Sequence, residues 1–432
     1  MDRREFLKAG AAGVGAALWP QAQSVLGQAA EAQVARIGVV GLGSRGTGLL
    51  RQLVIQEGAQ VTAVCDLDEG RAQQAVSIVQ EAQGHTPAVF TGQPDAYARM
   101  LGEAPIDGVL IATPTKWHCP MSVQAMKAGK HVGSEVPAGF TIDELWELVE
   151  TKEATGRRYM LLENYNYMQP NMAMCNMVAA GAFGDPYYVE SAYLHDCRFM
   201  LFNKDGSLSW WGEWASKFYG HDYPTHGLGP VCKWLGINDG NRMTRCCALM
   251  TQPRVLKKFA AERFGADSPQ AKIDWVNGDF TSVMIETSDG RLIRTDYDVN
   301  SPRPETIYYV LQGTGGIYDS RQGVFFEGEP GRWAPFAKML ERYDHGYWRR
   351  RAEQAAGAGH GGGDYFVLMD FVEMVRRDRE PWIDVYDGAS WSAIFDCSRK
   401  SIDAGGGSVE IPDFTRGRWK KADWRKDSLK PA

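Results

Sequence analysis

Apolar and polar positions in the first third of the chain follow two alternating patterns. Short runs such as IGVV, VTAV, GVLIA and YMLL are apolar without interruption, which is typical of strands buried on both faces. The segments between them repeat apolar residues at helical spacing. One of these, TIDELWELVETKEATG, has a capping box at Thr141 and Glu144 and a glycine stop at Gly156. We therefore predict an α/β Rossmann domain over residues 33–164, with a doubly wound parallel sheet.

The pattern changes after Asn164. Segments such as YYVESAYLH, DFTSVMIET, LIRTDYDV and IYYVLQGTGGIY are rich in β-branched and aromatic residues, which favours strands. They predict a C-terminal α+β domain over residues 165–432 with a large, open, mostly antiparallel sheet. Two late segments, DYFVLMDFVEMVRRD and GASWSAIFDCSRKSIDAG, predict helices that are candidates to pack back on the N-terminal domain.

The first 32 residues have a different character. Arg3 and Arg4 are followed by a weakly apolar stretch, AGAAGVGAALW, and then by small residues. This order is typical of a twin-arginine export signal. The stretch is too short and too rich in glycine to span a bilayer, and we find no other candidate membrane segment. We expect a periplasmic or secreted protein, cleaved near Ala30–Ala32.

Composition narrows the classes of function. The formal net charge is −6, from 53 acidic and 47 basic residues, which disfavours a general nucleic-acid-binding role. The eight cysteines form no CxxC pair, so the sequence supports neither a metal site nor a disulfide framework. The chain has 14 Trp and 17 Tyr residues; aromatic side chains build sugar-binding surfaces, although they build cores more often.

A glycine fingerprint follows the first predicted strand. Gly41, Gly43 and Gly46 fit the G-x-G-x-x-G pattern, in which the backbone turns tightly and approaches a pyrophosphate at a helix N-terminus. A second strand ends at Asp66, 20 residues after Gly46, where a carboxylate hydrogen-bonds the ribose hydroxyls. This acid favours NAD over NADP, although Arg45 offers an alternative anchor for a 2′-phosphate.

Polar residues also follow the other strands of the predicted parallel sheet. Thr113–His118 come after IDGVLIA, Glu135 after KHVGS, and Asn164 after RRYMLL. Ligands bind at the carboxyl ends of the strands in such sheets. We therefore expect these residues to lie beside the cofactor.

The stretch HDYPTHGLGP, residues 221–230, combines histidines with prolines and glycines. Its composition predicts a turn rather than a helix or a central strand. Histidine titrates near neutral pH, so His226 is a candidate base. Tyr223 would reach the same place if Pro224 bends the chain, and it would act as a base only if a neighbouring cation lowered its pKa. A histidine in such a loop is more often structural, and the loop by itself favours that role for both His221 and His226.

Several motifs together give the chain a family resemblance. It resembles the Gfo/Idh/MocA superfamily of NAD(P)-dependent sugar oxidoreductases, and within it glycoside hydrolase family 109, the NAD-dependent α-N-acetylgalactosaminidase type. Ordinary superfamily dehydrogenases carry a lysine after the glutamate of SEVPAG. Here Val136 follows Glu135, as in family 109, and an apolar side chain cannot carry a proton. The other matching motifs are KWH, LEN, YLHD, LFN, YPTHGLGP, NDGNR, QGTGG, YDH, GAGHGGGDYF and DVYD.

The resemblance assigns roles to particular positions. The cofactor contacts that it implies are Ser44, Arg45, Asp66, Thr115, Lys116, Trp117, His118, Glu135, Val136 and Asn164. The substrate contacts that it implies are Tyr193, Tyr223, Pro224, Thr225 and His226. Two departures from the family are visible. SWWGEW lacks an arginine that the family places near the cofactor, and Glu305 occupies the place of a sugar-contacting tyrosine. The carboxylate at that place counts against N-acetylgalactosamine as the substrate.

The resemblance also implies a redox route to glycoside cleavage. The cofactor takes a hydride from C3 of the sugar, a base removes the C2 proton, and the C1 substituent leaves by elimination. Water then adds at C1, and the hydride returns to C3. His226 is the expected first base, with Tyr223 at the same locus. His195, Tyr167 and Tyr193 are secondary candidates.

Two other functions stay open on the sequence alone. One is a periplasmic sugar oxidoreductase that holds NAD tightly and oxidises its substrate, and the other is a cofactor-binding sugar sensor without turnover. Val136 favours the glycosidase over the oxidoreductase. Glu305 leaves the hypothesis of a sugar sensor without turnover open. The glycine run around His360 is a candidate to close over a sugar or glycan substrate. The resemblance further implies a homo-oligomer formed through the C-terminal sheet. Candidates to stack on the sugar are Trp210, Trp211 and Trp214.

Overall fold

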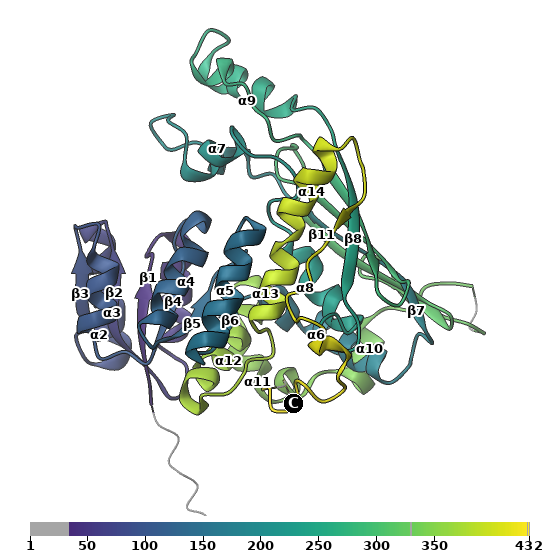
Figure 1. Cartoon of the computed structure of the whole chain (residues 1–432), viewed down its shortest axis with the longest axis horizontal. Helices are drawn as coiled ribbons and strands as arrows, with labels where there is room; N and C mark the ends of the chain where they lie inside the picture. Colours follow the sequence, from purple (N-terminus) through teal and green to yellow (C-terminus); the bar gives the residue numbers. More distant parts are fainter. Residues whose placement is uncertain (1–33, 329–330, 430, 432) are drawn as a thin grey trace, which may run out of the picture. The chain divides into compact units, whose positions relative to one another are not determined.

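The N-terminal half of the fold is a parallel sheet of six strands in the order β3-β2-β1-β4-β5-β6 (Figure 1). This computed structural model describes residues 34–328, 331–429 and 431. The predicted export signal over residues 1–32 lies outside the described residues. The strands are β1 (Ala35–Val40), β2 (Ala59–Asp66), β3 (Ala88–Thr91), β4 (Gly108–Ile111), β5 (His131–Ser134) and β6 (Tyr159–Leu161).

Helices connect these strands, as the alternating pattern predicts. α5 shows how local residues set both ends of a helix. The Thr141 hydroxyl accepts a hydrogen bond from the Glu144 backbone, the Glu144 carboxylate accepts one from the Thr141 backbone, and Gly156 ends the helix in a left-handed conformation. The order of the strands reverses at β1 and β4, which creates a crevice at their carboxyl ends. The helices are α1 (Ser44–Leu53), α2 (Glu69–Gln83), α3 (Ala96–Glu103), α4 (His118–Lys127) and α5 (Ile142–Thr155), with a short 3-10 turn η1 (Thr115–Trp117).

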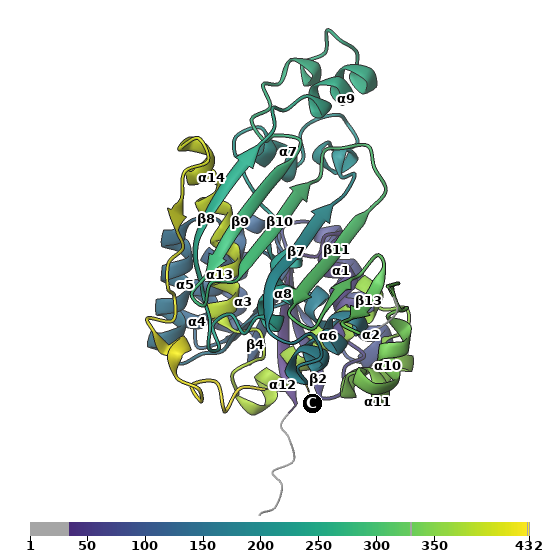
Figure 2. The ribbon, with the colours of Figure 1, turned by 90° about the vertical axis from the view of Figure 1, so that its right-hand side faces the viewer.

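The second sheet has eight strands in the order β13-β12-β11-β7-β10-β9-β8-β14, and Figure 2 shows its central strands side by side. Only β7 and β10 pair in parallel; the other neighbours are antiparallel. The predicted fold class, a Rossmann sheet followed by an α+β part with a large, mostly antiparallel sheet, is confirmed. The strands are β7 (Pro186–Leu194), β8 (Met243–Met250), β9 (Thr281–Thr287), β10 (Leu292–Asp298), β11 (Thr306–Gly313), β12 (Gly316–Asp319), β13 (Gly323–Phe326) and β14 (Val409–Glu410).

Helices cover one face of this second sheet. α8 contacts β7, β10 and β11, and α14 contacts β8. The helices are α6 (Gln169–Ala179), α7 (Trp210–Ala215), α8 (Thr225–Trp234), α9 (Val255–Phe264), α10 (Ala337–Tyr343), α11 (Gly346–Ala355), α12 (Gly363–Arg377), α13 (Val385–Ser392) and α14 (Ile394–Asp403), with short 3-10 turns η2 (Asn164–Tyr167), η3 (Arg198–Leu201), η4 (Gln270–Lys272), η5 (His360–Gly362) and η6 (Arg418–Lys420).

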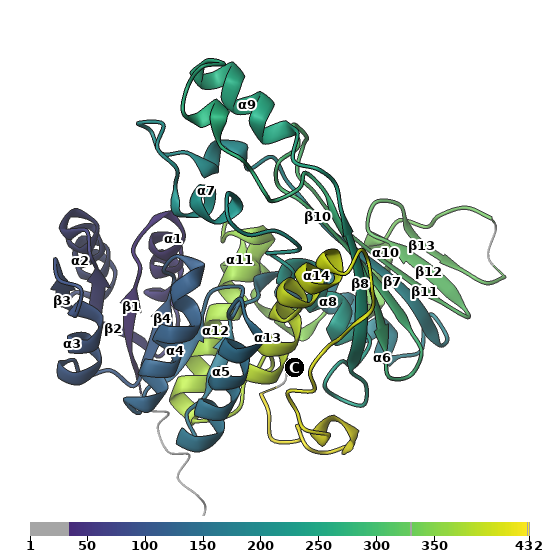
Figure 3. The ribbon, with the colours of Figure 1, turned by 45° about the horizontal axis from the view of Figure 1, so that its top comes forward.

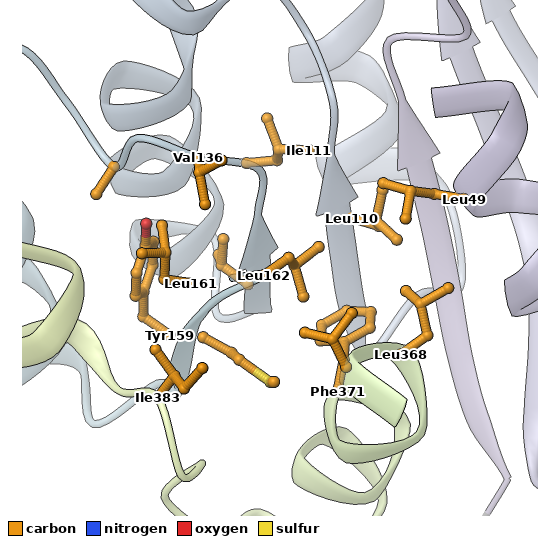
Figure 4. Close-up of a cluster of buried hydrophobic side chains, with 14 of the residues drawn as sticks. Leu49, Leu110, Ile111, Val136, Tyr159, Leu161, Leu162, Leu368, Phe371 and Ile383 are labelled. Carbon is orange, nitrogen blue, oxygen red and sulfur yellow. The ribbon is translucent and has the colours of Figure 1, made fainter. Parts of the chain in front are cut away.

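One late helix, α12, packs on the N-terminal sheet. It contacts β1 and α1, and Figures 1 and 3 show it in yellow-green among the blue and purple elements of that sheet. Leu368 and Phe371 of α12 lie beside Leu110 of β4 and Leu49 of α1 in the shared apolar core (Figure 4). Because all four side chains are fully buried, this contact holds α12 against the first sheet.

The stretch HDYPTHGLGP is not a turn throughout, so that prediction is corrected. α8 begins at Thr225, and Pro230 lies inside the helix. Proline has no N–H, so the carbonyl of His226, four residues earlier, loses its helical partner. The hydroxyl of Tyr309 on β11 donates to that carbonyl at 2.6 Å instead. The second sheet therefore satisfies the backbone group that Pro230 leaves free, and it holds the first turn of α8 in place.

Candidate active site

A cleft of about 1730 Å³ runs along the carboxyl ends of the parallel strands and reaches the second sheet. Small-molecule pockets usually measure roughly 300–1,000 Å³, so this cleft has room for two ligands side by side. One end is lined by residues of β1, β2, α1 and α2. The other end is lined by residues of α7, the end of β7, the start of α8 and the η5 segment.

The first end of the cleft has the features of a dinucleotide site. Gly41, Gly43 and Ser44 line it, and the backbone amides at the start of α1 face into the same turn. A Cβ at Gly46 would lie 1.7 Å from the Gly41 carbonyl oxygen, so only glycine allows this close approach of helix and strand. Asp66 at the end of β2 lines the cleft and accepts a hydrogen bond from the Leu42 amide at 2.6 Å. These residues fit a nucleotide cofactor.

The segment after β4 reaches the cleft only in part. Thr115, Trp117 and His118 line it, whereas Lys116 does not; its ammonium lies 5.8 Å from the Trp117 ring centroid. The two ring nitrogens of His118 lie 2.9 Å from the Pro137 carbonyl and 2.8 Å from the Thr113 carbonyl. Burial lowers the pKa of His118. His118 therefore ties the β4 and β5 loops together behind the cofactor site.

Arg45 is the centre of a buried ionic network. Its guanidinium donates to Glu135 at 2.7 Å and forms a bidentate pair with Asp364 at 2.7 and 2.8 Å. Asn164 donates to the same Asp364 carboxylate at 2.7 Å. Burial alone would raise the pKa of Asp364, but hydrogen bonds from Arg45 and His360 hold it well below its ordinary value. Because both partners occupy Arg45, the structure does not support it as an anchor for a 2′-phosphate.

The Arg45 network joins three parts of the chain: the start of α1, the loop after β5 and the first turn of α12. Asp364 was not among the residues expected from the sequence, although an acid in the first turn of a helix after a glycine run was a usable signal. Val136 is buried beside Glu135 and also lines the cleft. No lysine stands there to exchange a proton with a substrate.

His226 meets a carboxylate that the sequence analysis missed. Nδ1 of His226 lies 2.7 Å from Oε1 of Glu163, and both side chains are almost completely buried. Within the described part of the chain, no group bonds the other ring nitrogen, Nε2, and His226 lines the cleft. A carboxylate at Nδ1 holds the imidazole in place and favours the tautomer with Nε2 free to accept a proton. Glu163 lies two residues after the end of β6, so its place near a strand end was the available signal.

Glycine lets α8 approach this pair closely. A Cβ at Gly229 would lie 2.2 Å from Oδ1 of Asn166 and 2.9 Å from Cγ of Glu163. The ring of Tyr165 covers His226 from the side, with centroids 4.3 Å apart, and Tyr165 also lines the cleft. Tyr165 is a second residue that the sequence analysis missed. The pair is thus enclosed by η2, α8 and an aromatic ring.

Tyr223 and Tyr193 form an aromatic wall next to His226. Their ring centroids lie 5.2 Å apart and are 5.0 and 5.4 Å from the His226 ring. Burial raises the pKa of Tyr223 well above its ordinary value. The negative charges of Glu135 and Glu163 raise it further, and the positive charge of Arg45 opposes them only in part. The condition set for Tyr223 as a base is therefore not met in this structure. Its phenol stays protonated and suits a donor.

Other candidates lie away from the cleft. Pro224 precedes α8 as its N-cap, Thr225 is fully buried, and neither lines the cavity. Tyr167 donates to Asp370 at 2.7 Å inside the core, which removes it as a catalytic candidate. His221 is fully buried beside Thr295, at 3.1 Å, and burial lowers its pKa to about 3. A structural role for His221 agrees with these contacts.

The outer part of the cleft carries the remaining candidates. Nε2 of His195 lies 3.4 Å from Oε1 of Glu305, and both residues line the cleft. His360 lines it too, with Nδ1 3.1 Å from Asp364 and a strained positive φ of 52°. Asp222, which the sequence analysis did not single out, is 4% exposed and also lines the cleft. The aromatic residues Trp210, Trp211 and Trp214 line the same end.

The described residues form neither a candidate metal centre nor a membrane-spanning helix. In residues 34–328, 331–429 and 431, no group of three or more His, Cys, Asp or Glu side chains is arranged to hold a metal ion. None of the helices described for this chain has the length and apolar character needed to cross a membrane. All eight cysteines are free thiols.

Two protein-family models match adjoining parts of the chain. The one described as an oxidoreductase family with an NAD-binding Rossmann fold matches residues 35–163. The one described as the C-terminal domain of glycosyl hydrolase 109 matches residues 167–421. The match boundaries fall between β6 and β7, where the first sheet ends and the second begins.

Individual proteins give the same result. A glycosyl hydrolase family 109 protein of Saccharopolyspora erythraea is 39% identical over 95% of this chain and 90% of its own length. A protein of Tannerella forsythia named alpha-N-acetylgalactosaminidase is 36% identical over 96% of this chain and 97% of its own length. Among solved structures, scyllo-inositol dehydrogenase from Lactobacillus casei with bound NAD(H) and scyllo-inositol superposes with a TM-score of 0.63. It is 16% identical and covers 88% of this chain and 99% of its own, so that likeness concerns the fold.

Proposed function

The chain belongs to glycosyl hydrolase family 109, and from this premise we propose that it cleaves glycosides with the help of a nicotinamide cofactor that is regenerated in every turnover. The cleft supports this function because it offers a dinucleotide end and a sugar end in one continuous space. The observation that carries the proposal is the buried His226–Glu163 pair, with Nε2 open to the cleft between the two ends.

The residues at the dinucleotide end fit the cofactor. Gly41, Gly43 and Ser44 would hold the pyrophosphate, and Asp66 the adenosine ribose. When bound, the nicotinamide ring accepts a hydride from a sugar carbon and later returns it. The protein contributes binding, orientation and proton transfer. The buried Arg45–Glu135–Asp364 network keeps the floor of the site rigid.

His226 is the residue we assign to the first proton transfer. Nε2 takes the proton of the sugar 3-hydroxyl as C3 is oxidised to a ketone, and Glu163 stabilises the charge that forms on the ring. The ketone makes the C2 proton acidic. Loss of that proton breaks the C1–O bond, and the departing oxygen takes up a proton. Water then adds to C1 and a proton returns to C2. Once the hydride is back on C3 and His226 has returned its proton to the 3-oxygen, the sum of these steps is hydrolysis.

Tyr223 is placed to assist as a hydrogen-bond donor. Its hydroxyl stays protonated because burial raises its pKa, so it donates to an oxygen that gains negative charge rather than removing a proton. Val136 provides an apolar surface where a dehydrogenase of the superfamily would carry a proton-transferring lysine. That difference favours hydrolysis over net oxidation as the outcome.

The decisive experiment uses aryl glycosides with catalytic NAD⁺ and no other electron acceptor. Release of the aryl alcohol beyond the amount of NAD⁺, with deuterium from D₂O at C2 of the recovered sugar, supports the proposal. Stoichiometric growth of NADH absorbance without aryl alcohol would point to a sugar oxidoreductase. Binding of nucleotide and sugar with neither product would point to a sensor. A panel of α- and β-glycosides identifies the preferred sugar and anomer.

We propose NAD rather than NADP as the cofactor. Asp66 would hydrogen-bond the ribose hydroxyls and repel a 2′-phosphate, and Arg45 is occupied by two carboxylates. The test is the ratio of NADP to NAD dissociation constants in wild type and in Asp66→Ser. We expect a ratio well above one in wild type and a lower ratio in the variant. A wild-type preference for NADP would contradict this assignment.

We further propose export by the twin-arginine route and assembly of the chain into a homo-oligomer. Arg3 and Arg4 support the first, and replacing both by lysine should retain the protein in the cytoplasm, as fractionation would show. The second is supported by exposed apolar side chains on neighbouring strands of the second sheet. Light scattering of wild type and Leu249→Glu tests it, with dissociation expected in the variant. These side chains are Leu249 (66% exposed), Met284 (40%) and Leu292 (40%).

A further inference from the structure

The sugar end of the cleft is lined by acids and by the histidines His195, His226 and His360, without a lysine or arginine. Arg45, Arg51 and Arg71, the arginines that line the cleft, lie on α1 and α2 at the dinucleotide end, and no lysine lines it. The acids at the sugar end are Asp196, Asp222 and Glu305. Asp196 is neutralised by a bidentate pair with Arg198 at 2.7 and 2.8 Å. Asp222 and Glu305 remain.

Glu305 has no basic partner within the residues that the structure describes except His195. Arg303, two positions earlier, turns to Asp298 at 3.7 Å. Burial lowers the pKa of His195, although Glu305 raises it, so the imidazole is largely neutral at neutral pH. The Glu305 side chain is 57% exposed at the mouth of the cleft. Its carboxylate therefore faces the ligand space with an uncompensated charge.

Asp222 is the second unpaired acid. It is 4% exposed, and neither carboxylate oxygen has a hydrogen-bond partner among the described residues. Burial raises the pKa of Asp222 to about 6. The Tyr297 hydroxyl and the Trp214 indole lie near enough to oppose this rise, but neither is in position to donate a hydrogen bond to the carboxylate. A buried carboxylate without a partner is costly, and a cation in the cleft would reduce that cost. This orphan group points independently to a positively charged ligand.

Aromatic rings line the same end of the cleft, among them Tyr193, Trp211 and Tyr223. Tyr193 lies 5.0 Å from the His195 ring and stacks 6.5 Å from Tyr297, and Tyr223 lies 6.5 Å from Trp211. Rings of this kind attract an ammonium group through their π faces. A carboxylate accepts hydrogen bonds but cannot donate one, so it repels an acidic sugar, and it binds a protonated amine more strongly than the neutral N–H of an N-acetyl group.

We propose that the sugar end of the cleft takes a glycoside whose sugar carries a free, protonated amino group, and that Glu305 binds this group while Asp222 strengthens the negative potential around it. The inference rests on the proposed glycosidase function and specifies its substrate class. It explains why a carboxylate stands where the family resemblance expects a tyrosine. Acidic sugars and N-acetylated sugars are then the disfavoured substrates.

Calorimetric titration of the NAD-loaded protein tests the inference without turnover. The probes are methyl α-galactosaminide, methyl N-acetyl-α-galactosaminide and methyl α-galactoside at pH 7. We expect the free amine to bind about tenfold or more tightly than either neutral glycoside, because a hydrogen bond between charged groups is stronger than one between neutral groups. Glu305→Gln should remove most of this preference, and Asp222→Asn should reduce it by a smaller factor.

Two further variants sharpen the test. Glu305→Tyr restores the residue that the resemblance expects and should shift the preference toward the N-acetylated glycoside. Glu341→Gln removes an exposed carboxylate on α10, outside the cleft, and should leave all three affinities unchanged. Equal affinities in wild type, no measurable binding of the galactosaminide, or a preference that survives in Glu305→Gln would each overturn the inference.

Failure of this inference is separable from failure of the proposed function. If wild type releases aryl alcohol from a neutral glycoside with recycled NAD⁺ and shows no amine preference, the glycosidase function stands and the substrate class is wrong. If the amine binds selectively and no aryl glycoside is cleaved, the glycosidase function is wrong while Glu305 still selects a cationic sugar.

Discussion

Nδ1 of His226 lies 2.7 Å from Oε1 of Glu163, although the two residues are 63 positions apart in the chain. One comes from the first turn of α8 and the other from the end of β6. The arrangement turns an ordinary histidine into an oriented one, because the carboxylate binds one ring nitrogen and leaves the other to face the cleft. The predictions below test this pair and the contacts that hold it.

His226→Ala should lower kcat by about 10²–10⁴-fold, the usual contribution of a general acid or base, while nucleotide binding persists. The assay is turnover of the best aryl glycoside, with circular dichroism and bound nucleotide measured on the same sample. His226→Gln is the companion variant, because its amide can still donate to Glu163 and avoids leaving that carboxylate unpaired. Full activity in both variants would exclude His226 as the base.

Gly229→Ala should disturb the pair without touching its chemistry. The added Cβ would meet Asn166 and Glu163 at 2.2 and 2.9 Å, so η2 and α8 must separate. We expect a loss of stability of about 1–3 kcal/mol, as for other overpacked cores, together with a lower kcat. The matched control is Gly102→Ala in α3, where nothing lies within 4 Å and alanine should stabilise by about 0.5–1 kcal/mol. The free energy of unfolding, from chemical denaturation, and kcat are measured for both variants. Equal values for Gly229→Ala and Gly102→Ala would contradict the close packing of α8 against η2.

Tyr309→Phe should leave the buried His226 carbonyl without a donor. The expected cost is about 1–3 kcal/mol in the free energy of unfolding, because Pro230 cannot supply the missing N–H. Pro230→Ala restores an N–H at the helical distance from that carbonyl. The double variant should therefore be less destabilised than the sum of its single changes, and a double-mutant cycle in denaturant measures this. Strict additivity would show that the two groups do not serve the same carbonyl.

Asp364→Asn should reduce stability in a pH-dependent way. The pKa of Asp364 is lowered in the folded state, so its contribution is fully present above the unfolded carboxyl pKa of about 3.9 and is lost as the pH falls through the folded value. At pH 7 we expect the free energy of unfolding to fall by about 3 kcal/mol, the low end of the range for a broken buried ion pair. The low end applies because Arg45 still pairs with Glu135 in the variant. The gap in Tm between wild type and variant should then narrow below about pH 4.

The control for that variant is an acid paired on the surface. Asp185 pairs with Arg291 at 3.0 Å, and its side chain is 75% exposed. Asp185→Asn should change the free energy of unfolding by less than about 1 kcal/mol at any pH, since exposed pairs are screened by solvent. If Asp364→Asn behaves like Asp185→Asn, the Arg45 network does not hold α12 to the first sheet.

Much of the fold could be predicted from local patterns. The apolar runs define buried strands, and Thr141, Glu144 and Gly156 specify both ends of one helix because capping depends on neighbouring residues alone. Gly41, Gly43 and Asp66 place the cofactor end of the cleft for the same reason: a strand, a turn and a helix N-terminus adjoin in sequence. Local rules misjudged α8, however, since Pro230 and the glycines predicted a turn, whereas the Tyr309 hydroxyl makes a helix tolerable there.

The sequence by itself determined the two-sheet architecture and the dinucleotide turn, because each depends on spacing along the chain, and its family resemblance indicated His226 as a candidate base. Only the tertiary structure decided that Glu163 orients His226, that Arg45 is taken by Glu135 and Asp364, and that Tyr223 stays protonated. Those facts depend on burial and on contacts between residues up to 319 positions apart, from Arg45 to Asp364. Charge pairing and desolvation act through space, so no pattern along the chain contains them.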